Sequence, residues 1–258
     1  MKEVNYQKDK NVAFVISSCD HYSDLWEPFF KNFFKYWPDC PYDVCLISNF
    51  KDYPDPRVIT IKIGEDKSYA DNLRNALKSI NHKWVLLWLD DVIFSGKVDT
   101  ETLKRIVLEA ESINAGFVKL DEKLPLAYDN KTKLLIAELP KGIKYRSAVG
   151  LGLVQKKVLL KLAEPGFSAW DMDKSKVSDS MDELFCAFTK KGAKKMPFTY
   201  IHALIKGQWH LGAIRALKKE GFHDLLKTRN PQSIWAFLYI QLYQARLGVY
   251  KFFNRYWY

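Results

Sequence analysis

The sequence lacks the short motifs that mark several common classes of enzyme and metal-binding protein. Its cysteines, Cys19, Cys40, Cys45 and Cys186, form no CxxC pair, which argues against a structural zinc site and favours reduced thiols. No GxGxxG follows the first apolar segment and no GxxxxGK[ST] occurs, so neither a Rossmann dinucleotide site nor a P-loop is indicated. The GxSxG motif of α/β-hydrolases is absent too.

Long apolar runs are also missing. No stretch approaches the roughly 20 apolar residues that a membrane-spanning helix needs. The opening residues, MKEVNYQKDKN, are polar and charged, so no cleavable signal is indicated. We therefore expect a cytoplasmic protein, with peripheral contact at the inner face of the plasma membrane as an option.

Positive charge is plentiful, with 40 Lys and Arg against 30 Asp and Glu, a net charge of +10, and 15% aromatic residues. The excess lies mostly in residues 186–258, whereas residues 12–60 are nearly balanced. A basic, aromatic chain can bind nucleic acid, anionic lipid or phosphorylated substrates. Composition alone leaves these partners open.

The first 115 residues alternate between segments typical of strands and segments typical of helices. Apolar runs predict strands at 12–16, 43–48, 58–63 and 84–89. Apolar residues at helical spacing predict helices over 24–37, 68–80 and 100–115. This alternation is typical of an α/β fold with a mostly parallel, doubly wound sheet and flanking helices.

We expect one α/β domain over residues 1–230, followed by a C-terminal helical tail at 231–258. Residues 1–115 would form its nucleotide-binding half and residues 116–230 its acceptor half. In the second half we interpret Ser180–Lys190 as a helix.

The stretch from Trp84 to Leu89 consists of six large apolar residues, and Asp90 and Asp91 follow it directly. This pattern predicts a strand buried on both faces that emerges at the edge of a sheet. Ligands of open α/β sheets bind outside the carboxyl ends of the strands. The two carboxylates could hold Mn²⁺ or Mg²⁺, and through it a diphosphate. The alternative is an ordinary turn or helix-capping acid.

Polar residues follow two other predicted strands. Ser18, Cys19 and Asp20 follow the first, and Asn49 follows the second. Together with Asp90, these side chains would line a nucleotide-sized crevice. Asp20 is expected to accept a hydrogen bond from a base or ribose hydroxyl, or else to cap the helix that follows.

Four more residues are candidates for contact with the donor or a metal. Asp71 and Arg74 share one face of the helix at 68–80, where Arg74 could meet a phosphate and Asp71 a sugar or base. Lys206, beside Gly207 in a loop that we interpret as flexible, could neutralise a leaving diphosphate. His202 could complete a metal site. The alternatives are a solvated ion pair and a structural histidine.

A second group of acids could supply the general base that activates an acceptor hydroxyl, with Asp171 and Asp182 as the preferred candidates. The group consists of Asp171, Asp173, Asp179, Asp182 and Glu183. Asp171 directly follows Trp170, which could hold it in place. The alternative is that both are solvated loop residues.

The C-terminal tail, IWAFLYIQLYQARLGVYKFFNRYWY, is apolar nearly all round, rich in aromatic residues, and contains cations but no acid. This composition fits a helix lying in a membrane interface. The alternative is a helix docked on the domain or used for dimerisation.

The order of these segments resembles the A-type fold of nucleotide-sugar-dependent bacterial glycosyltransferases. The resemblance rests on VAFVISSCD, SYADNLRNAL, LWLDD and SAWDMD. It implies that Asp20 reads the base, Arg74 lies near the phosphates, and Asp90 and Asp91 hold a metal and the diphosphate. The usual acidic motif is Asp-any-Asp, whereas Val92 follows the adjacent pair here. Charge neutralisation by Arg74, Lys206 or a histidine is therefore the alternative to a metal.

We therefore expect a glycosyltransferase that moves a sugar from a nucleotide-diphosphate donor to a glycan or lipid-linked acceptor in surface-polysaccharide biosynthesis. One alternative is a nucleotidyltransferase, which would usually show a Gly-rich basic loop where SSCDHYSD stands. Another is a non-catalytic module that binds nucleic acid or membranes, against which the strand-end acids argue. We expect no nucleic-acid partner, and the oligomeric state is left open.

Overall fold

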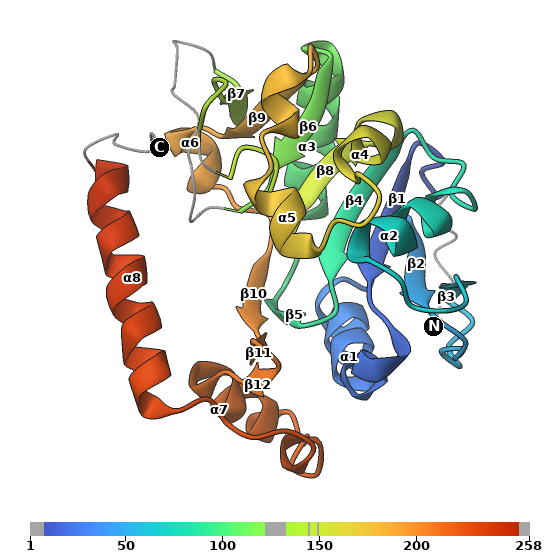
Figure 1. Ribbon diagram of the computed structural model, residues 1–258, viewed down its shortest axis with the longest axis vertical. Coiled ribbons are helices and arrows are strands. Elements are labelled where there is room, and N and C mark those ends of the chain that lie inside the picture. Colours follow the sequence, from blue (N-terminus) through green and yellow to red (C-terminus); the bar gives the residue numbers. More distant parts are fainter. Residues whose placement is uncertain (1–7, 122–132, 144, 149, 253–258) are drawn as a thin grey trace.

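The computed structural model describes residues 8–121, 133–143, 145–148 and 150–252. Its centre is an eight-stranded sheet with the order β3-β2-β1-β4-β8-β6-β9-β7 (Figure 1). The strands are β1 (Val12–Ser17), β2 (Asp43–Ser48), β3 (Val58–Lys62), β4 (Trp84–Leu89), β6 (Ala115–Lys119), β7 (Ile136–Glu138), β8 (Gly152–Gln155) and β9 (Leu184–Phe188).

Most neighbouring strands of this sheet run in parallel. β3, β2, β1 and β4 form one parallel half. β8 lies antiparallel between β4 and β6, and β6 pairs in parallel with β9. β4, β6 and β9 therefore run in the same direction, and their carboxyl ends lie at the same edge as those of β1 and β2. The predicted α/β class and mostly parallel sheet are confirmed.

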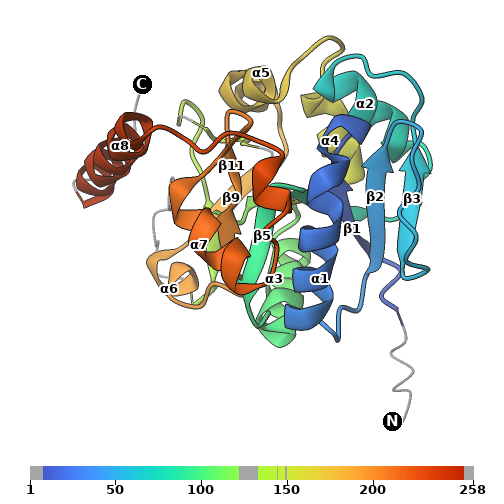
Figure 2. The same cartoon turned by 90° about the horizontal axis from the view of Figure 1, so that it is seen from below.

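Helices cover both faces of the sheet (Figures 1 and 2). One face packs against α1 (Trp26–Tyr36), α3 (Thr100–Ser112) and α7 (Leu211–Lys219). The other packs against α2 (Tyr69–Leu77), α4 (Lys156–Leu162) and α5 (Ala169–Lys174). Each central strand supplies both cores, because alternate side chains point to opposite faces.

Strand β1 shows this alternation. Phe14 and Ile16 belong to the cluster with α1, whereas Ala13 and Val15 belong to the cluster with α2. Every one of these side chains is fully buried. A continuous apolar run is therefore what this position in the sheet requires.

The predicted helix over residues 180–190 is wrong, because this segment contains strand β9. Phe185 packs on one face of the sheet, whereas Cys186 and Phe188 pack on the other. A strand buried on both faces is a short continuous apolar run, which periodicity alone does not distinguish from a buried helix.

Strand β5 (Val92–Gly96) was not predicted. It begins immediately after Asp91 and pairs antiparallel with β10 (Thr199–His202), a second strand more than 100 residues away in the chain. Asp90 and Asp91 therefore form a two-residue turn between β4 and β5. The Trp88 indole fixes this turn, since its Nε1 donates to the carbonyl of Val92 at 2.6 Å.

The remaining elements are short, except for the last helix. They are η1 (Asp20–Leu25), η2 (Val177–Ser180), α6 (Lys190–Ala193), β11 (Leu204–Ile205), β12 (Gln208–Trp209), η3 (Leu225–Lys227) and α8 (Ile234–Phe252). Helix α8 stands away from the sheet in both views (Figures 1 and 2). In the described part of the chain, no helix is both long and apolar enough to cross a bilayer.

The proposed division into residues 1–115, 116–230 and 231–258 stays a prediction. The pairing of β4 with β8 joins the first two parts in one continuous sheet. The tail is helical as expected, and α8 begins at Ile234.

Candidate donor-binding site

The carboxyl ends of β1 and β4 meet through a hydrogen-bonded chain of side chains. Ser18 Oγ donates to Asp90 Oδ2, and Trp26 Nε1 donates to Ser18 Oγ at 2.7 Å. Register explains the contact, because Ser17 and Leu89 lie side by side in the parallel pair. The residues that follow these two strands are therefore neighbours, as the sequence predicts.

Asp20 and Asn49 join the ends of β1 and β2. The backbone amide of Asn49 donates to Asp20 Oδ1 at 3.0 Å, and the backbone amide of Asp20 donates to Asn49 Oδ1 at 2.9 Å. The Phe50 amide donates to the other Asp20 oxygen at 3.1 Å. Asp20 thus stabilises the loop after β2 at the strand ends, and its proposed contact with a base stays a prediction.

Asp90 and Asp91 are two acids in a poorly solvated place. Burial, followed by the charge of Asp91, raises the pKa of Asp90 to about 8. Burial also raises the pKa of Asp91 to about 6. A cation placed here would favour the ionised forms, so the pair has the electrostatics of a cation-binding or diphosphate-binding site.

The pairing of β5 with β10 brings His202 to this turn. His202 lies opposite Val92, and the Ala203 amide donates to the carbonyl of Asp91 at 2.7 Å. Among the described residues, no three side chains of His, Cys, Asp or Glu converge as a metal site. Mg²⁺ and Mn²⁺ sites commonly use one or two carboxylates and take their other ligands from water and phosphate. The adjacent pair of Asp90 and Asp91 therefore fits such an ion.

A cation next to this cluster comes from a residue that the sequence did not single out. Arg229 forms a bidentate pair with Asp24, with Nε and Nη2 at 2.9 and 2.7 Å from the two carboxylate oxygens. Its guanidinium lies over the Tyr22 ring at 4.6 Å, and the charge of Asp90 helps to raise its pKa, after the Asp24 hydrogen bond. The C-terminal segment therefore reaches η1 and the acid pair.

The sequence also did not single out Tyr69, at the start of α2, whose hydroxyl is buried. Burial raises its pKa, and the charges of Asp173, Asp90 and Asp91 raise it further. Asp173 also acts on Lys119, whose pKa burial lowers. Tyr69 thus lies within the electrostatic reach of both Asp173 on α5 and the acid pair.

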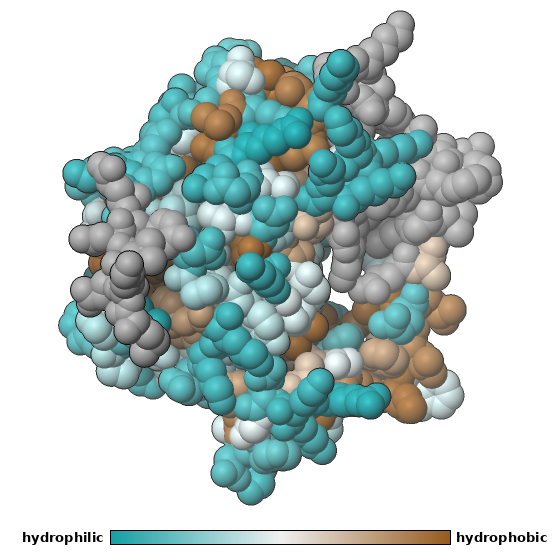
Figure 3. Space-filling view, turned by 180° about the vertical axis from the view of Figure 1, so that it is seen from behind, coloured by the Kyte–Doolittle hydropathy of each residue, from teal (hydrophilic) through white to brown (hydrophobic). Residues whose placement is uncertain are grey.

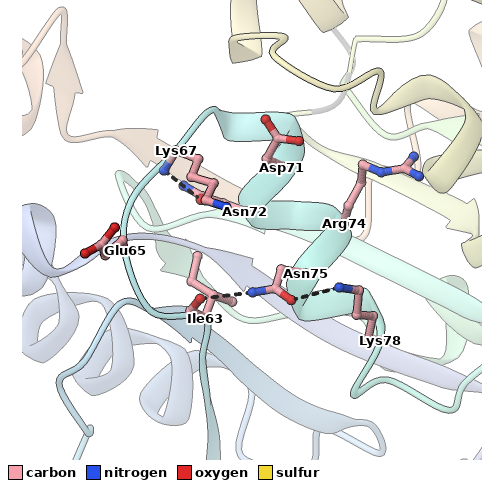
Figure 4. A pocket seen from close by; sticks show the side chains of 8 residues that line it. All are labelled: Ile63, Glu65, Lys67, Asp71, Asn72, Arg74, Asn75 and Lys78. Atoms are coloured by element: carbon pink, nitrogen blue, oxygen red, sulfur yellow. Dashed lines mark hydrogen bonds between the residues drawn. The ribbon is translucent and has the colours of Figure 1, made fainter.

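Asp71 and Arg74 lie in a different place. They line a surface pocket of about 570 Å³ along α2, whose other lining residues are Ile63, Glu65, Lys67, Asn72, Asn75 and Lys78 (Figure 4). Arg74 Nη1 donates to the carbonyls of Leu160 and Ala163 at the end of α4, at 2.7 and 3.2 Å. Asp71 accepts a hydrogen bond from the Gly166 amide at 3.0 Å. In this structure both residues hold the segment after α4.

The two predicted bases do not join the acid pair. Asp171 closes a capping box at the start of α5, where it accepts the Ser168 amide at 2.9 Å. Asp182 precedes β9, so it lies at the amino edge of the sheet, opposite the edge where Asp90 follows β4. Asp173, on the same helix as Asp171, instead acts through its charge on Tyr69, as Asp90 and Asp91 do.

Two other candidates have simple local roles in the structure. Cys19 precedes η1, and burial raises the pKa of its thiol, with a smaller effect from Asp90. Lys206 and Gly207 have positive φ angles of 50° and 76° and form the two-residue turn between β11 and β12. The loop that we interpreted as flexible is a tight hairpin turn.

Sequence patterns contained weak signals for the missed residues. Lys119 ends an apolar run, AGFVK, and a lysine in such a strand needs a polar partner. Asp173 was already one of the acids from which the base was expected, although Asp171 was preferred. Arg229 carried no signal, because only the folded chain places it beside η1.

No protein-family model and no curated protein sequence matches the chain. Solved structures do match it. A UDP-glucose pyrophosphorylase from Acinetobacter baumannii has a TM-score of 0.50 at 11% identity, covering 91% of this chain and 99% of that one. The mannosyltransferase PcManGT from Pyrobaculum calidifontis, in complex with GDP-Man and Mn²⁺, has a TM-score of 0.48 at 16% identity, covering 98% and 75%.

S. aureus TarS 1-349 has a TM-score of 0.40 at 10% identity, covering 69% of this chain and 60% of its own length. At such identities a match shows the fold alone. The match to the pyrophosphorylase, together with the sheet order, gives the chain the nucleotide-diphospho-sugar transferase fold. The A-type architecture expected from the sequence is consistent with this fold.

Proposed function

We propose that this protein is a glycosyltransferase that moves a sugar from a nucleoside-diphosphate donor to a glycan or lipid-linked acceptor in surface-polysaccharide biosynthesis. It would act at the cytoplasmic face of the membrane, in peripheral contact with it. The observation that supports this proposal best is the meeting of three strand ends. Ser18, Asp20, Asn49, Asp90 and Asp91 come from β1, β2 and β4 and lie at one edge of the sheet.

Asp90 and Asp91 would hold Mn²⁺ or Mg²⁺ together with the donor diphosphate. The bound ion would offset the negative charge that develops on the departing diphosphate. Ser18 and Trp26 orient the Asp90 carboxylate, so its position is set before the donor binds. Arg229 pairs with Asp24 and so holds η1 in place next to these strand ends.

The acceptor hydroxyl must lose a proton, and α5 offers the base. We favour Asp173, because its charge acts on Tyr69 beside the acid pair and on buried Lys119. Asp171 lies on the same short helix, but its carboxylate closes the helix cap. Asp173 is half-buried and takes no part in this capping box.

A nucleotidyltransferase is the second candidate function, and the similarity of the fold to that of a UDP-glucose pyrophosphorylase supports it. The segment after β1 argues against nucleotidyl transfer. This segment is the 3₁₀ helix η1, which carries Asp20 and Asp24 where a Gly-rich basic loop would hold a nucleoside triphosphate. A non-catalytic module is disfavoured by the uncompensated strand-end acids, which would repel a phosphate backbone.

A thermal-shift screen tests the proposal. Nucleotide sugars, and nucleoside triphosphates with sugar 1-phosphates, would be added with and without Mn²⁺. We expect one nucleotide sugar to raise the melting temperature, and the ion to increase the shift. With that donor, Asp91→Ala should lower turnover at least about 10³-fold, because it removes charge stabilisation of the leaving group.

Asp224→Ala is the matched control, since Asp224 is an exposed acid paired only with Lys227 in the described structure. It should leave turnover unchanged. Normal turnover in Asp91→Ala would refute the diphosphate site. Stabilisation by a triphosphate, with release of pyrophosphate, would instead establish the nucleotidyltransferase.

A further inference from the structure

Helix α8 presents a stripe of large apolar side chains to solvent. Its members recur in adjacent pairs every four residues, which places them along one side of the helix. They are Ile234, Trp235, Leu238, Tyr239, Leu242 and Tyr243. Trp235 and Leu242 are 78% and 71% exposed, far more than side chains of this size in a covered helix. Figure 3 shows the hydrophobic surface over this helix.

The stripe has the chemistry of a membrane interface. Trp235, Tyr239 and Tyr243 combine an apolar ring with a polar N–H or O–H, a combination enriched where bilayer and water meet. Residues Leu225 to Tyr258 contain no acid. A helix of this kind lies in the headgroup region, in agreement with the finding that no described helix could cross a bilayer.

Exposed cations lie on α7, the α-helix that precedes α8 in the chain. Arg215, Lys218 and Lys219 of α7 are exposed and make no ion pair within the described part of the chain. The start of α7 lies near α8, because the ring of His210, which precedes α7, lies 5.5 Å from that of Phe237 in α8. Positive charge beside an aromatic stripe is complementary to an anionic lipid surface.

The base of α8 is also fixed to the candidate site. The Gln232 amide donates to the Trp209 carbonyl at 2.8 Å, and Arg229, three residues earlier, is paired with Asp24. A bilayer that bound α8 would therefore lie at a set position relative to Asp24 and the acid pair.

From these observations we infer that α8 docks the protein on a membrane surface rich in anionic headgroups and holds the site beside it. The inference deepens the proposed function, and it rests on that function for the purpose of docking, namely access to a lipid-linked acceptor. The occupant is a bilayer and not a second copy, because two basic surfaces would repel each other whereas anionic headgroups attract them.

Co-sedimentation of the full chain with vesicles tests the inference. Neutral phosphatidylcholine vesicles would be compared with vesicles that contain about one third phosphatidylglycerol. We expect binding to the anionic vesicles to be at least tenfold stronger and to weaken at high salt, because screening shortens the range of attraction. Trp235 fluorescence should shift to the blue on binding, and this shift should be lost in Trp235→Phe.

Two variants separate the stripe from the cations. Trp235→Ser with Leu242→Ser should reduce binding to both vesicle types at least tenfold, since two large apolar side chains no longer leave water. Lys218→Ser with Lys219→Ser should reduce only the anionic preference, by about fivefold per charge. Leu108→Ser is the matched control, because Leu108 is 66% exposed on α3 and should not affect binding.

The inference is overturned if the stripe variant binds vesicles as the unaltered protein does. It is also overturned if sedimentation equilibrium shows a dimer that the stripe variant dissociates while vesicles are not bound. Donor stabilisation measured on the same variants distinguishes the two proposals. If a stripe variant loses vesicle binding but is still stabilised by the donor, the loss is due to α8 and the donor site is intact. If the protein binds vesicles but no nucleotide sugar stabilises it, the proposed function is refuted and the docking is not.

Discussion

Two carboxylates near the same strand ends, Asp24 and Asp90, meet opposite electrostatic surroundings. Burial pushes the pKa of Asp24 upward, but the hydrogen bonds and charge of Arg229 outweigh it, and the pKa lies below its usual value. Asp90 is buried beside Asp91, and its pKa rises to about 8. The residue types are the same, so the difference comes from their surroundings: Asp90 is buried more deeply and lies beside another acid, whereas Asp24 is paired with a cation of the fold.

The two carboxylates therefore have different roles. The charge of Asp24 stabilises the fold, whereas the charge of Asp90 is available to bind a cation. The pair of Asp24 and Arg229 fastens the C-terminal segment to η1, and its charges cancel within the protein. The ionised pair of Asp90 and Asp91 destabilises the folded chain until a cation arrives. Binding of that cation therefore also stabilises the fold.

Two aspartates of α5 also differ in role, one structural and one that we propose to be catalytic. Substitution of the second should have the largest effect. Asp171→Asn alters a cap, whereas Asp173→Asn removes the base that we propose. With the donor found by the thermal-shift screen, we expect Asp173→Asn to lower kcat by about 10²- to 10⁴-fold. Asp171→Asn should change kcat less than about threefold, because the Asn side-chain oxygen can still accept the hydrogen bond from the Ser168 backbone amide.

Initial rates at saturating donor measure both variants, and circular dichroism checks that each is folded. Equal losses in the two variants would mean that α5 acts only as a structural element. A loss confined to Asp171→Asn would return the role of base to the residue that the sequence favours.

Removal of the cation from the compensated pair should convert it into an uncompensated one. Arg229→Ala leaves Asp24 partly buried and unpaired, and we expect a loss of about 2 kcal/mol in the free energy of unfolding. This is less than the roughly 3–5 kcal/mol for a fully buried pair, because both side chains are partly exposed. Chemical denaturation measures the loss.

Lys227→Ala is the control for this experiment. Lys227 lies two residues before Arg229 and forms an exposed ion pair with Asp224. It should cause no measurable change. The double variant Arg229→Ala, Asp24→Asn should recover part of the lost stability, because no charge is then left unpaired. A single variant as stable as the parent would show that the pair does not hold the C-terminal segment.

The contrast also explains how much of the site the sequence could predict. Asp90, Ser18 and Asn49 were found because each directly follows a buried strand, and parallel strands end at one edge. This argument uses only local pattern and sheet direction. It worked for the half of the sheet in which strands and helices alternate.

The rest depended on contacts between distant parts of the chain. Arg229 reaches Asp24 across more than 200 residues, and β10 brings His202 to the turn after β4 across more than 100. Asp182 was a second candidate base beside Asp171, but the direction of β9 places it at the edge of the sheet opposite Asp90. No periodicity in the sequence contains this information, because packing sets it.

The smallest expected effect concerns the pH dependence of Asp90. In the unfolded chain an aspartate ionises near pH 4, whereas folded Asp90 keeps its proton until about pH 8. The folded state therefore loses stability as the pH rises between these values. Asp90→Asn does not titrate, so we expect its stability relative to the parent to rise as the pH increases from 4 to 8. Thermal unfolding with a chelator present measures it.

Asp24→Asn should show the opposite dependence. The folded pKa of Asp24 is lowered, so its ionised form stabilises the fold above the unfolded pKa, and this stability is lost as the pH falls through the folded value. Its substitution should therefore cost stability at pH 8 and little near pH 3. Parallel pH profiles for the two variants would contradict the contrast, because they would mean that Arg229 and Asp91 do not set the two pKa values in opposite directions.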